Sequence, residues 1–282
     1  MSIKQFGLVF VIIFFTLLLI YSDDKIDITN PEAAFQQAKQ QEQKRNYKIA
    51  FDIYDKLLMN TEFSSAKEAY NNALNCLSYL NKTHETDAFR EKVLKKNEAN
   101  PNIRIAVAES YIQAPKYGYL IENEFSRGYG ISKGGFYANP IERDRTRALQ
   151  ILEGTKEYLG ANAILKAEYH ISYANALMHN RSHKLSWALQ DLTNISILPD
   201  FDKNYYGMQA QNAPVDKSGE PILYPIPETF EKAENDGQRW RFHLEAAKKS
   251  NPKLINSVDY NFASFLLSQW GVATLGNEWA SK

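Results

Sequence analysis

Residues 32–60, EAAFQQAKQQEQKRNYKIAFDIYDKLLMN, show the clearest structural pattern in the chain. Small residues run along its first half, a tight turn follows at Asn46, and Ala50, Tyr54 and Leu57 come next at spacings of three and four. Side chains at these spacings lie on one face of a helix. The stretch therefore predicts two helices that pack against each other through their apolar faces.

A looser unit of the same kind follows at 65–99. The dipeptide that begins at Ala50 recurs at Ala88, 38 positions on, close to the roughly 34-residue length of a tetratricopeptide repeat. One helix pair cannot bury its apolar face alone, so such pairs stack on one another. We expect tetratricopeptide-like helical repeats over 23–113, with the next pair beginning at Pro101.

Apolar stripes with helical spacing continue toward the end of the chain, and no stretch alternates for long enough to predict a strand. Further stripes are Ala66, Ala69, Tyr70, Ala73, Leu74, Leu77 and Leu80; Leu165, Tyr169, Tyr173, Ala176 and Leu177; and Val258, Phe262, Phe265, Leu266 and Gln269. The sequence thus predicts an all-α fold, an array of helical hairpins that forms an α-solenoid.

Asn-Pro pairs mark the expected starts of four helices. An Asn side chain accepts a hydrogen bond from a free N–H of the first turn, and a Pro in that turn has no N–H to leave unpaired. The pairs are Asn30-Pro31, Asn100-Pro101, Asn139-Pro140 and Asn251-Pro252.

Two segments interrupt the helical pattern. Residues 114–141 contain five glycines and several aromatic residues, which predicts an irregular loop. A Pro-rich loop is expected at 199–227, with a turn at Asp216 to Gly219, inside an otherwise helical region that spans 142–282. Loops of this length are uncommon in compact domains and are often ordered for a purpose.

The N-terminal segment 6–21 is uncharged, with Lys4 before it and Asp23 after it. This arrangement is typical of an export signal. At roughly 1.5 Å per residue it spans about 24 Å as a helix, slightly less than the roughly 30 Å of a membrane's hydrocarbon core. We expect residues 1–22 to be a signal peptide or an uncleaved signal-anchor. The rest would then lie in the periplasm or cell envelope, free or tethered to the inner membrane.

Composition narrows the classes of partner. The 33 basic and 33 acidic residues cancel, so no net field attracts nucleic acid. The single cysteine, Cys76, excludes an intrachain disulfide, and its place in an apolar stripe predicts a core residue, not a reactive thiolate.

No residue pattern predicts a catalytic, cofactor-binding or metal site. The glycine cluster GYGISKGG at 128–135 lacks the spacing of a dinucleotide loop and the Gly-Lys-Ser/Thr of a P-loop. His179 and His183 stand four apart, with His170 upstream, so they are either surface histidines at a helix end, which we expect, or ligands of a zinc site. The alternating charges of ERDRTR, 142–147, predict a salt-bridged, solvated helix face.

From about Tyr111 onward the chain resembles the N-terminal helical region of bacterial proteins of the alpha-2-macroglobulin type. The strings that carry the resemblance are YIQAPKYGYLIENEFSRG (111–128), ERDRTRALQIL (142–152), APVDKSGEPILYPIPETFEKAENDGQRWRF (213–242) and FLLSQWGVATL (265–275). The resemblance implies an exported endopeptidase inhibitor, whose relatives continue into sandwich domains. We expect this chain to be a member truncated before those domains, the first part of a split gene, or a helical region used alone. The resemblance supplies no inhibitory residue, and Cys76-Leu77-Ser78 is not the thioester Cys-x-Glu-Gln.

We therefore expect a non-catalytic, exported helical-repeat module, the scaffold or interaction region of an alpha-2-macroglobulin-like inhibitor. Its partners would be proteins, either proteases or the downstream inhibitor domains. Two alternatives remain. The chain could be a free-standing tetratricopeptide-like scaffold of the envelope, or an enzyme whose site lies in the glycine-rich loop 114–141 near His170 or Glu142.

Overall fold

The computed structural model describes residues 28–128, 134–181, 183–202 and 214–270, and these are mostly helical. The helices are α2 (Pro31–Gln43), α3 (Tyr47–Leu57), α4 (Ala66–Tyr79), α5 (Thr86–Lys96), α6 (Pro101–Ile112), α7 (Ile141–Glu153), α8 (Ala163–Met178), α9 (Asp236–Ser250) and α10 (Ile255–Trp270). Short 3-10 helices lie between them: η1 (Thr83–Glu85), η2 (Lys156–Tyr158), η3 (His183–Gln190), η4 (Phe230–Lys232) and η5 (Pro252–Leu254).

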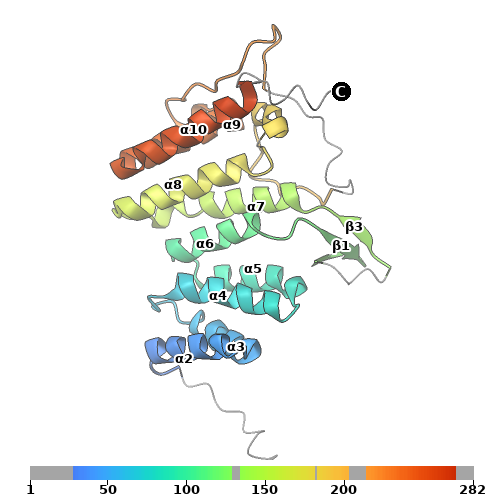
Figure 1. The fold of residues 1–282 in the computed structure, drawn as a ribbon, viewed down its shortest axis with the longest axis vertical. Helices are drawn as coiled ribbons and strands as arrows, with labels where there is room; N and C mark the ends of the chain where they lie inside the picture. Colours follow the sequence, from blue (N-terminus) through green and yellow to red (C-terminus); the bar gives the residue numbers. More distant parts are fainter. Residues whose placement is uncertain (1–27, 129–133, 182, 203–213, 271–282) are drawn as a thin grey trace, which may run out of the picture.

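The helices form a tall stack whose order along the long axis follows the sequence (Figure 1). α2 packs on α3, α3 on α4, α6 on α7 and α8 on α9. Contacts also join alternate helices, because α4 contacts α6, α6 contacts α8, and Lys39 of α2 forms an ion pair with Glu68 of α4. We call the side of the stack that α2, α4, α6 and α8 form the even-helix face.

The predicted helix starts explain where several of these elements begin. The side-chain oxygen of Asn30 accepts the N–H of Ala33 at 3.1 Å, and Pro31 is the first residue of α2. Asn100 caps α6 in the same way. The fourth Asn-Pro pair, at Asn251, caps the short η5 and not an α-helix.

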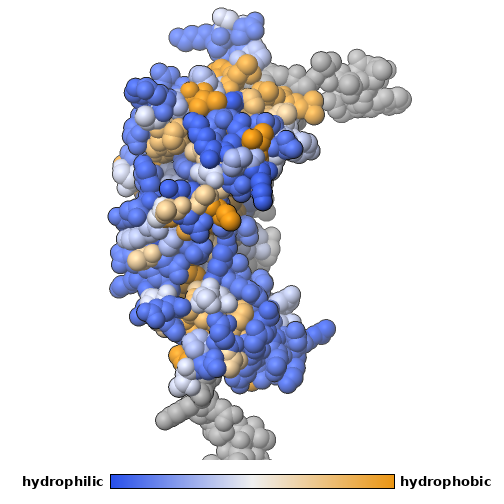
Figure 2. All heavy atoms as spheres, turned by 90° about the vertical axis from the view of Figure 1, so that its left-hand side faces the viewer, coloured by the Kyte–Doolittle hydropathy of each residue, from blue (hydrophilic) through white to orange (hydrophobic). Residues whose placement is uncertain are grey.

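A single apolar core runs through the stack. It contains the predicted stripes, since Tyr54, Tyr70, Leu77, Tyr173 and Phe265 are all buried. Figure 2 shows one side of the molecule as largely hydrophilic, with apolar residues gathered toward the end that carries α9 and α10. No helix within the described ranges is long and apolar enough to span a membrane, and the segment 6–21 lies outside those ranges.

The all-α prediction needs one correction, because the expected loop 114–141 contains a small antiparallel sheet. Its strands are β1 (Gly118–Ile121), β2 (Glu124–Arg127) and β3 (Phe136–Ala138), in the order β2-β1-β3. Gly118 pairs with Arg127 and with Ala138 across the two edges of β1. The sheet projects from the side of the stack (Figure 1).

In the Pro-rich loop 199–227, the turn predicted at Asp216 to Gly219 is present. The backbone oxygen of Asp216 accepts the N–H of Gly219 at 3.0 Å, and its side chain accepts the N–H of Ser218 at 2.7 Å. Gly219 has a φ of +84°, which glycine adopts readily. The middle of the loop, 203–213, lies outside the described residues.

Candidate binding groove

A groove of about 280 Å³ lies on the even-helix face, between α4 and α6. One wall consists of Asn71, Leu74, Asn75 and Ser78 of α4. These positions follow the i, i+3, i+4, i+7 spacing that places side chains on one helix face. Asn71, Asn75 and Ser78 are exposed, so this wall offers amide and hydroxyl groups to a ligand.

The opposite wall repeats that spacing on α6. Ala106, Glu109, Ser110 and Gln113 line the groove. Ala106 has a short side chain, which keeps the wall low, and Gln113 is exposed at the C-terminal end of the helix. Two polar stripes thus face each other, although about thirty residues separate them along the chain.

The floor is held by Arg90 of α5, which is only 3% exposed. Its guanidinium donates to the Ser110 hydroxyl at 3.0 Å and to the Ser110 backbone oxygen at 3.1 Å, and it forms an ion pair with Asp87 at 2.6 Å. The Tyr70 hydroxyl lies 2.7 Å from the same Ser110 hydroxyl, and burial raises the pKa of Tyr70 to about 12. Because these contacts join α4, α5 and α6, the groove has a fixed shape.

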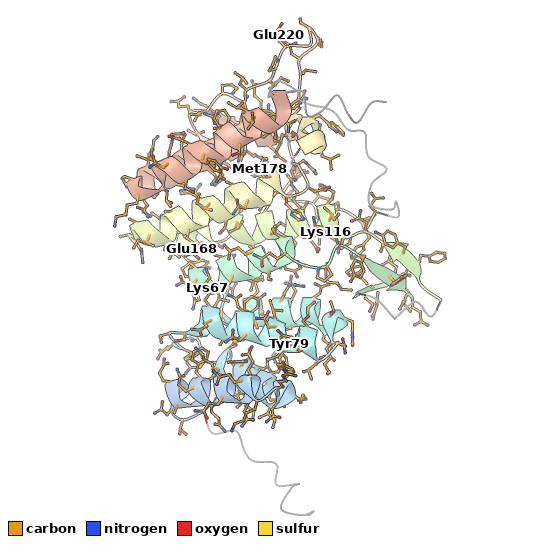
Figure 3. The ribbon with its side chains drawn as sticks, in the orientation of Figure 1. Lys67, Tyr79, Lys116, Glu168, Met178 and Glu220 are labelled. Carbon is orange, nitrogen blue, oxygen red and sulfur yellow. The ribbon has the colours of Figure 1, made fainter. Side chains whose placement is uncertain are left out.

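Charged contacts extend the groove along the face. Lys67 of α4 forms an ion pair with Glu168 of α8 and lies 4.0 Å from Glu109 of α6. Glu109 in turn accepts the Ser172 hydroxyl of α8 at 2.6 Å. Figure 3 shows Lys67 and Glu168 at the same side of the stack, with α6 between their helices. Toward the other end, Lys39 of α2 contacts Glu68 of α4 at 2.9 Å.

Two amide side chains of the groove are available to form hydrogen bonds with a ligand. The side chains of Asn71 and Asn75 form no hydrogen bond with the part of the chain that the structure describes. An amide carries both donors and acceptors, which match the alternating N–H and C=O groups of an extended backbone. The arrangement therefore suits hydrogen bonding to a peptide backbone.

The structure places the sequence-predicted residues as follows. Cys76 is fully buried, which confirms the core prediction, and burial raises its pKa to about 12. His170 does not approach His179; its Nδ1 lies 2.9 Å from Nδ1 of His243 on α9. Within the described ranges, no three His, Cys, Asp or Glu side chains lie where they would share a metal ion. The glycine cluster lies largely outside those ranges and leads into β3, not into a helix.

The prediction of a solvated face for ERDRTR is wrong. Arg145 is fully buried and donates to Asp236 at 2.6 Å, while Asp144 is 5% exposed and accepts both Nη atoms of Arg127 at 2.8 Å. Helix α7 lies between α6 and α8, so most of its surface is covered. The alternating charges are salt-bridged as expected, and their partners are Arg127 of β2, Asp236 of α9, Glu91 of α5 and Arg181 after α8.

The sequence does not predict the groove between α4 and α6. Asn71 and Asn75 stand four apart on the predicted helix over 66–80, and this spacing of two exposed amides was the available signal. The two amides form one wall of a groove only because α6 packs beside α4, and the sequence does not predict that packing. Comparison of the chain with known protein families, with curated proteins and with solved structures gives no match.

Proposed function

We propose that this protein is a non-catalytic, tetratricopeptide-like repeat module that binds an extended segment of a partner protein along the even-helix face. The repeat assignment is supported by the order of helix packing, in which α3 packs on α4, α4 on α6 and α6 on α8. Stacking of this kind produces long surfaces that suit extended ligands.

One observation carries the proposal: two polar stripes with the same helical spacing face each other across one groove. Asn71 and Asn75 offer unpaired amides, and Glu109 and Gln113 stand opposite. A partner backbone that lies between the stripes can exchange hydrogen bonds with both. The ion pairs of Lys67 and Lys39 along the same face add charged positions that select among sequences.

The resemblance to alpha-2-macroglobulin-type proteins suggests which partner this is. On that basis the bound segment belongs to the sandwich domains of such an inhibitor or to a protease, and the module works outside the cytoplasm, with 6–21 as signal or tether. The alternative is a free-standing envelope scaffold. The chemistry of the groove is the same in both cases, so the identity of the bound sequence distinguishes them.

The test is a peptide selection followed by measured affinities. Displayed random peptides are selected on the full chain in lipid nanodiscs, and the best binders are titrated calorimetrically. The variant Asn71→Ala/Asn75→Ala is expected to bind about tenfold more weakly, because each lost hydrogen bond contributes about 0.5–1.5 kcal/mol.

The matched control is Asn256→Ala/Asn261→Ala, which removes two exposed amides from α10. It should bind the peptides as the unsubstituted chain does. The proposal fails if no peptide is enriched, or if both double variants lose the same affinity. Enriched sequences that match linkers between sandwich domains would favour the inhibitor assignment over the free-standing scaffold.

A further inference from the structure

A second and larger cavity, of about 610 Å³, lies at the opposite end of the stack from α2. Four segments enclose it: the end of α7 with η2, the first half of α8, the middle of α9 and the η4 segment. Its volume falls in the range of pockets that hold small organic molecules. The groove proposed above for a protein partner shares no residue with it.

The inner walls are aromatic. Phe230 and Tyr169 each meet the His243 ring edge to face, at centroid distances of 5.4 and 6.0 Å, and Phe242 packs on the same ring at 5.5 Å. The outer face of an aromatic ring is electron-rich and attracts a cation. The walls therefore suit a ligand with a flat apolar body, and they tolerate a positive charge beside it.

At the base lies a pair of histidines that carries no charge near neutral pH. His243 is 3% exposed, and its Nδ1 shares a hydrogen bond of 2.9 Å with Nδ1 of His170. Burial, with Lys166 and Lys156 nearby, lowers the pKa of His170 to about 4, and burial lowers the pKa of His243 well below its usual value. The Nε2 atom of His243 has no hydrogen-bond partner within the described part of the chain. The cavity thus contains a buried polar atom that the protein leaves unsatisfied.

The rim of the cavity is acidic. It has four carboxylates, on Glu153, Glu157, Glu228 and Glu231, against two ammonium groups, on Lys156 and Lys166. Lys156 lies 3.8 Å from Glu231, and Glu228 forms an ion pair with Lys232 outside the lining. Glu153 accepts the Tyr173 hydroxyl at 3.1 Å and keeps its charge at the rim. With four carboxylates against two ammonium groups, the lining favours a cation over an anion.

We propose that this cavity binds a small organic cation, an amine attached to an aromatic body. The aromatic part lies among Tyr169, Phe230 and Phe242, and the ammonium group lies at the rim near Glu157. The proposal does not depend on the peptide groove, because the two sites share no lining residue.

The test compares two ligands of matched shape and opposite charge. Tryptamine and indole-3-propionate share the indole and the two-carbon linker, so any difference in affinity reports the charged group. Both are titrated calorimetrically into the full chain in nanodiscs, with empty nanodiscs subtracted. We expect saturable binding of tryptamine and at least tenfold weaker binding of indole-3-propionate.

Two variants locate the binding. Glu157→Lys reverses an exposed rim charge and should abolish the preference for tryptamine, whereas Glu62→Lys makes the same change in the exposed loop before α4 and should leave it intact. Thr229→Trp places a large side chain at the mouth and should remove binding of both ligands. The proposal is overturned by an absence of saturable binding, by equal affinities for the two ligands, or by equal effects of the two Glu→Lys variants.

Discussion

Gly237, at the start of α9, occupies a position where no other residue fits. A β-carbon at this position would overlap the ring of Tyr224, which is fully buried. Gly237→Ala is therefore expected to lower the free energy of unfolding by about 1–3 kcal/mol through overpacking, as measured by denaturant titration. In Gly154→Ala the new methyl group meets only the end of the flexible Arg104 side chain, so this control should cost less. Equal losses in the two variants would show that the contact with Tyr224 is unimportant.

Arg145 and Asp236 form a fully buried ion pair between α7 and α9. Asp236 also accepts the Thr193 hydroxyl, and Arg145 donates to the Leu177 backbone oxygen at 3.1 Å. Arg145→Met leaves the buried Asp236 with only the longer ion pair to Arg239, at 3.3 Å. The variant is therefore expected to lower the free energy of unfolding by about 3 kcal/mol, the low end for a broken buried ion pair. The double variant Arg145→Met/Asp236→Leu should recover part of that loss. If the double variant lost as much free energy of unfolding as the Arg145→Met and Asp236→Leu variants lose together, the two residues would not act as a pair.

This ion pair also connects two distant segments of the sequence that carry many charged residues. ERDRTR at 142–147 and NDGQRWR at 235–241 lie about ninety residues apart, and the pair joins them directly. The sequence predicts a helix and alternating charges for the first string, and both are present. It does not predict burial, because burial depends on β2 and α9, whose positions beside α7 are set by the long insertions between helices.

Among the elements, α8 and α9 carry three histidines that should make the free energy of unfolding depend on pH. His170 and His243 lie where α8 packs on α9, and His179 lies at the C-terminal end of α8. Burial lowers the pKa of His170 and of His179 to about 4, and it lowers the pKa of His243 well below its usual value. The unfolded chain, whose histidines titrate near 6.5, binds more protons than the folded chain between about pH 4 and 6.5. The contribution of these histidines to the free energy of unfolding therefore rises with pH across this window. It is fully present above about pH 6.5 and is lost as the pH falls toward 4.

Thermal unfolding measured from pH 4 to 7.5 tests this directly. His170→Gln should flatten the pH dependence, because it removes one of the groups that protonate on unfolding. The exposed His84 supplies a control, and His84→Gln should leave the slope unchanged. An unaltered slope in His170→Gln would mean that other groups control acid unfolding.

The helices were predictable and the small sheet was not, for a physical reason. Each helix contains enough turns for its apolar stripe to repeat several times, whereas β1, β2 and β3 contain only three or four residues each. Alternation over four residues cannot be recognised by pattern. The glycines that argue against a helix here include Gly118, whose lack of a side chain admits the ring of Phe125 in the paired strand.

At the scale of the whole molecule, the groove exists only because the stack exists. Its two stripes lie on α4 and α6 and come together because these two helices contact each other. Each stripe alone resembles an ordinary solvated helix face, so the residues of the site can be read from the sequence but their meeting cannot. The packing of α4 on α6 joins the two stripes into one surface, which is the basis of the binding function proposed for this chain.

Site-specific photo-crosslinking in cells of the protein's source tests that function most directly. A photoreactive amino acid replaces Asn75 in the groove or, as the control, Asn256 on α10, and crosslinked peptides are identified by mass spectrometry. We expect a discrete adduct at position 75 that maps to one extended segment of a partner protein, and no such adduct at position 256. Adducts of equal yield and the same identity at both positions, or none at position 75, would contradict it.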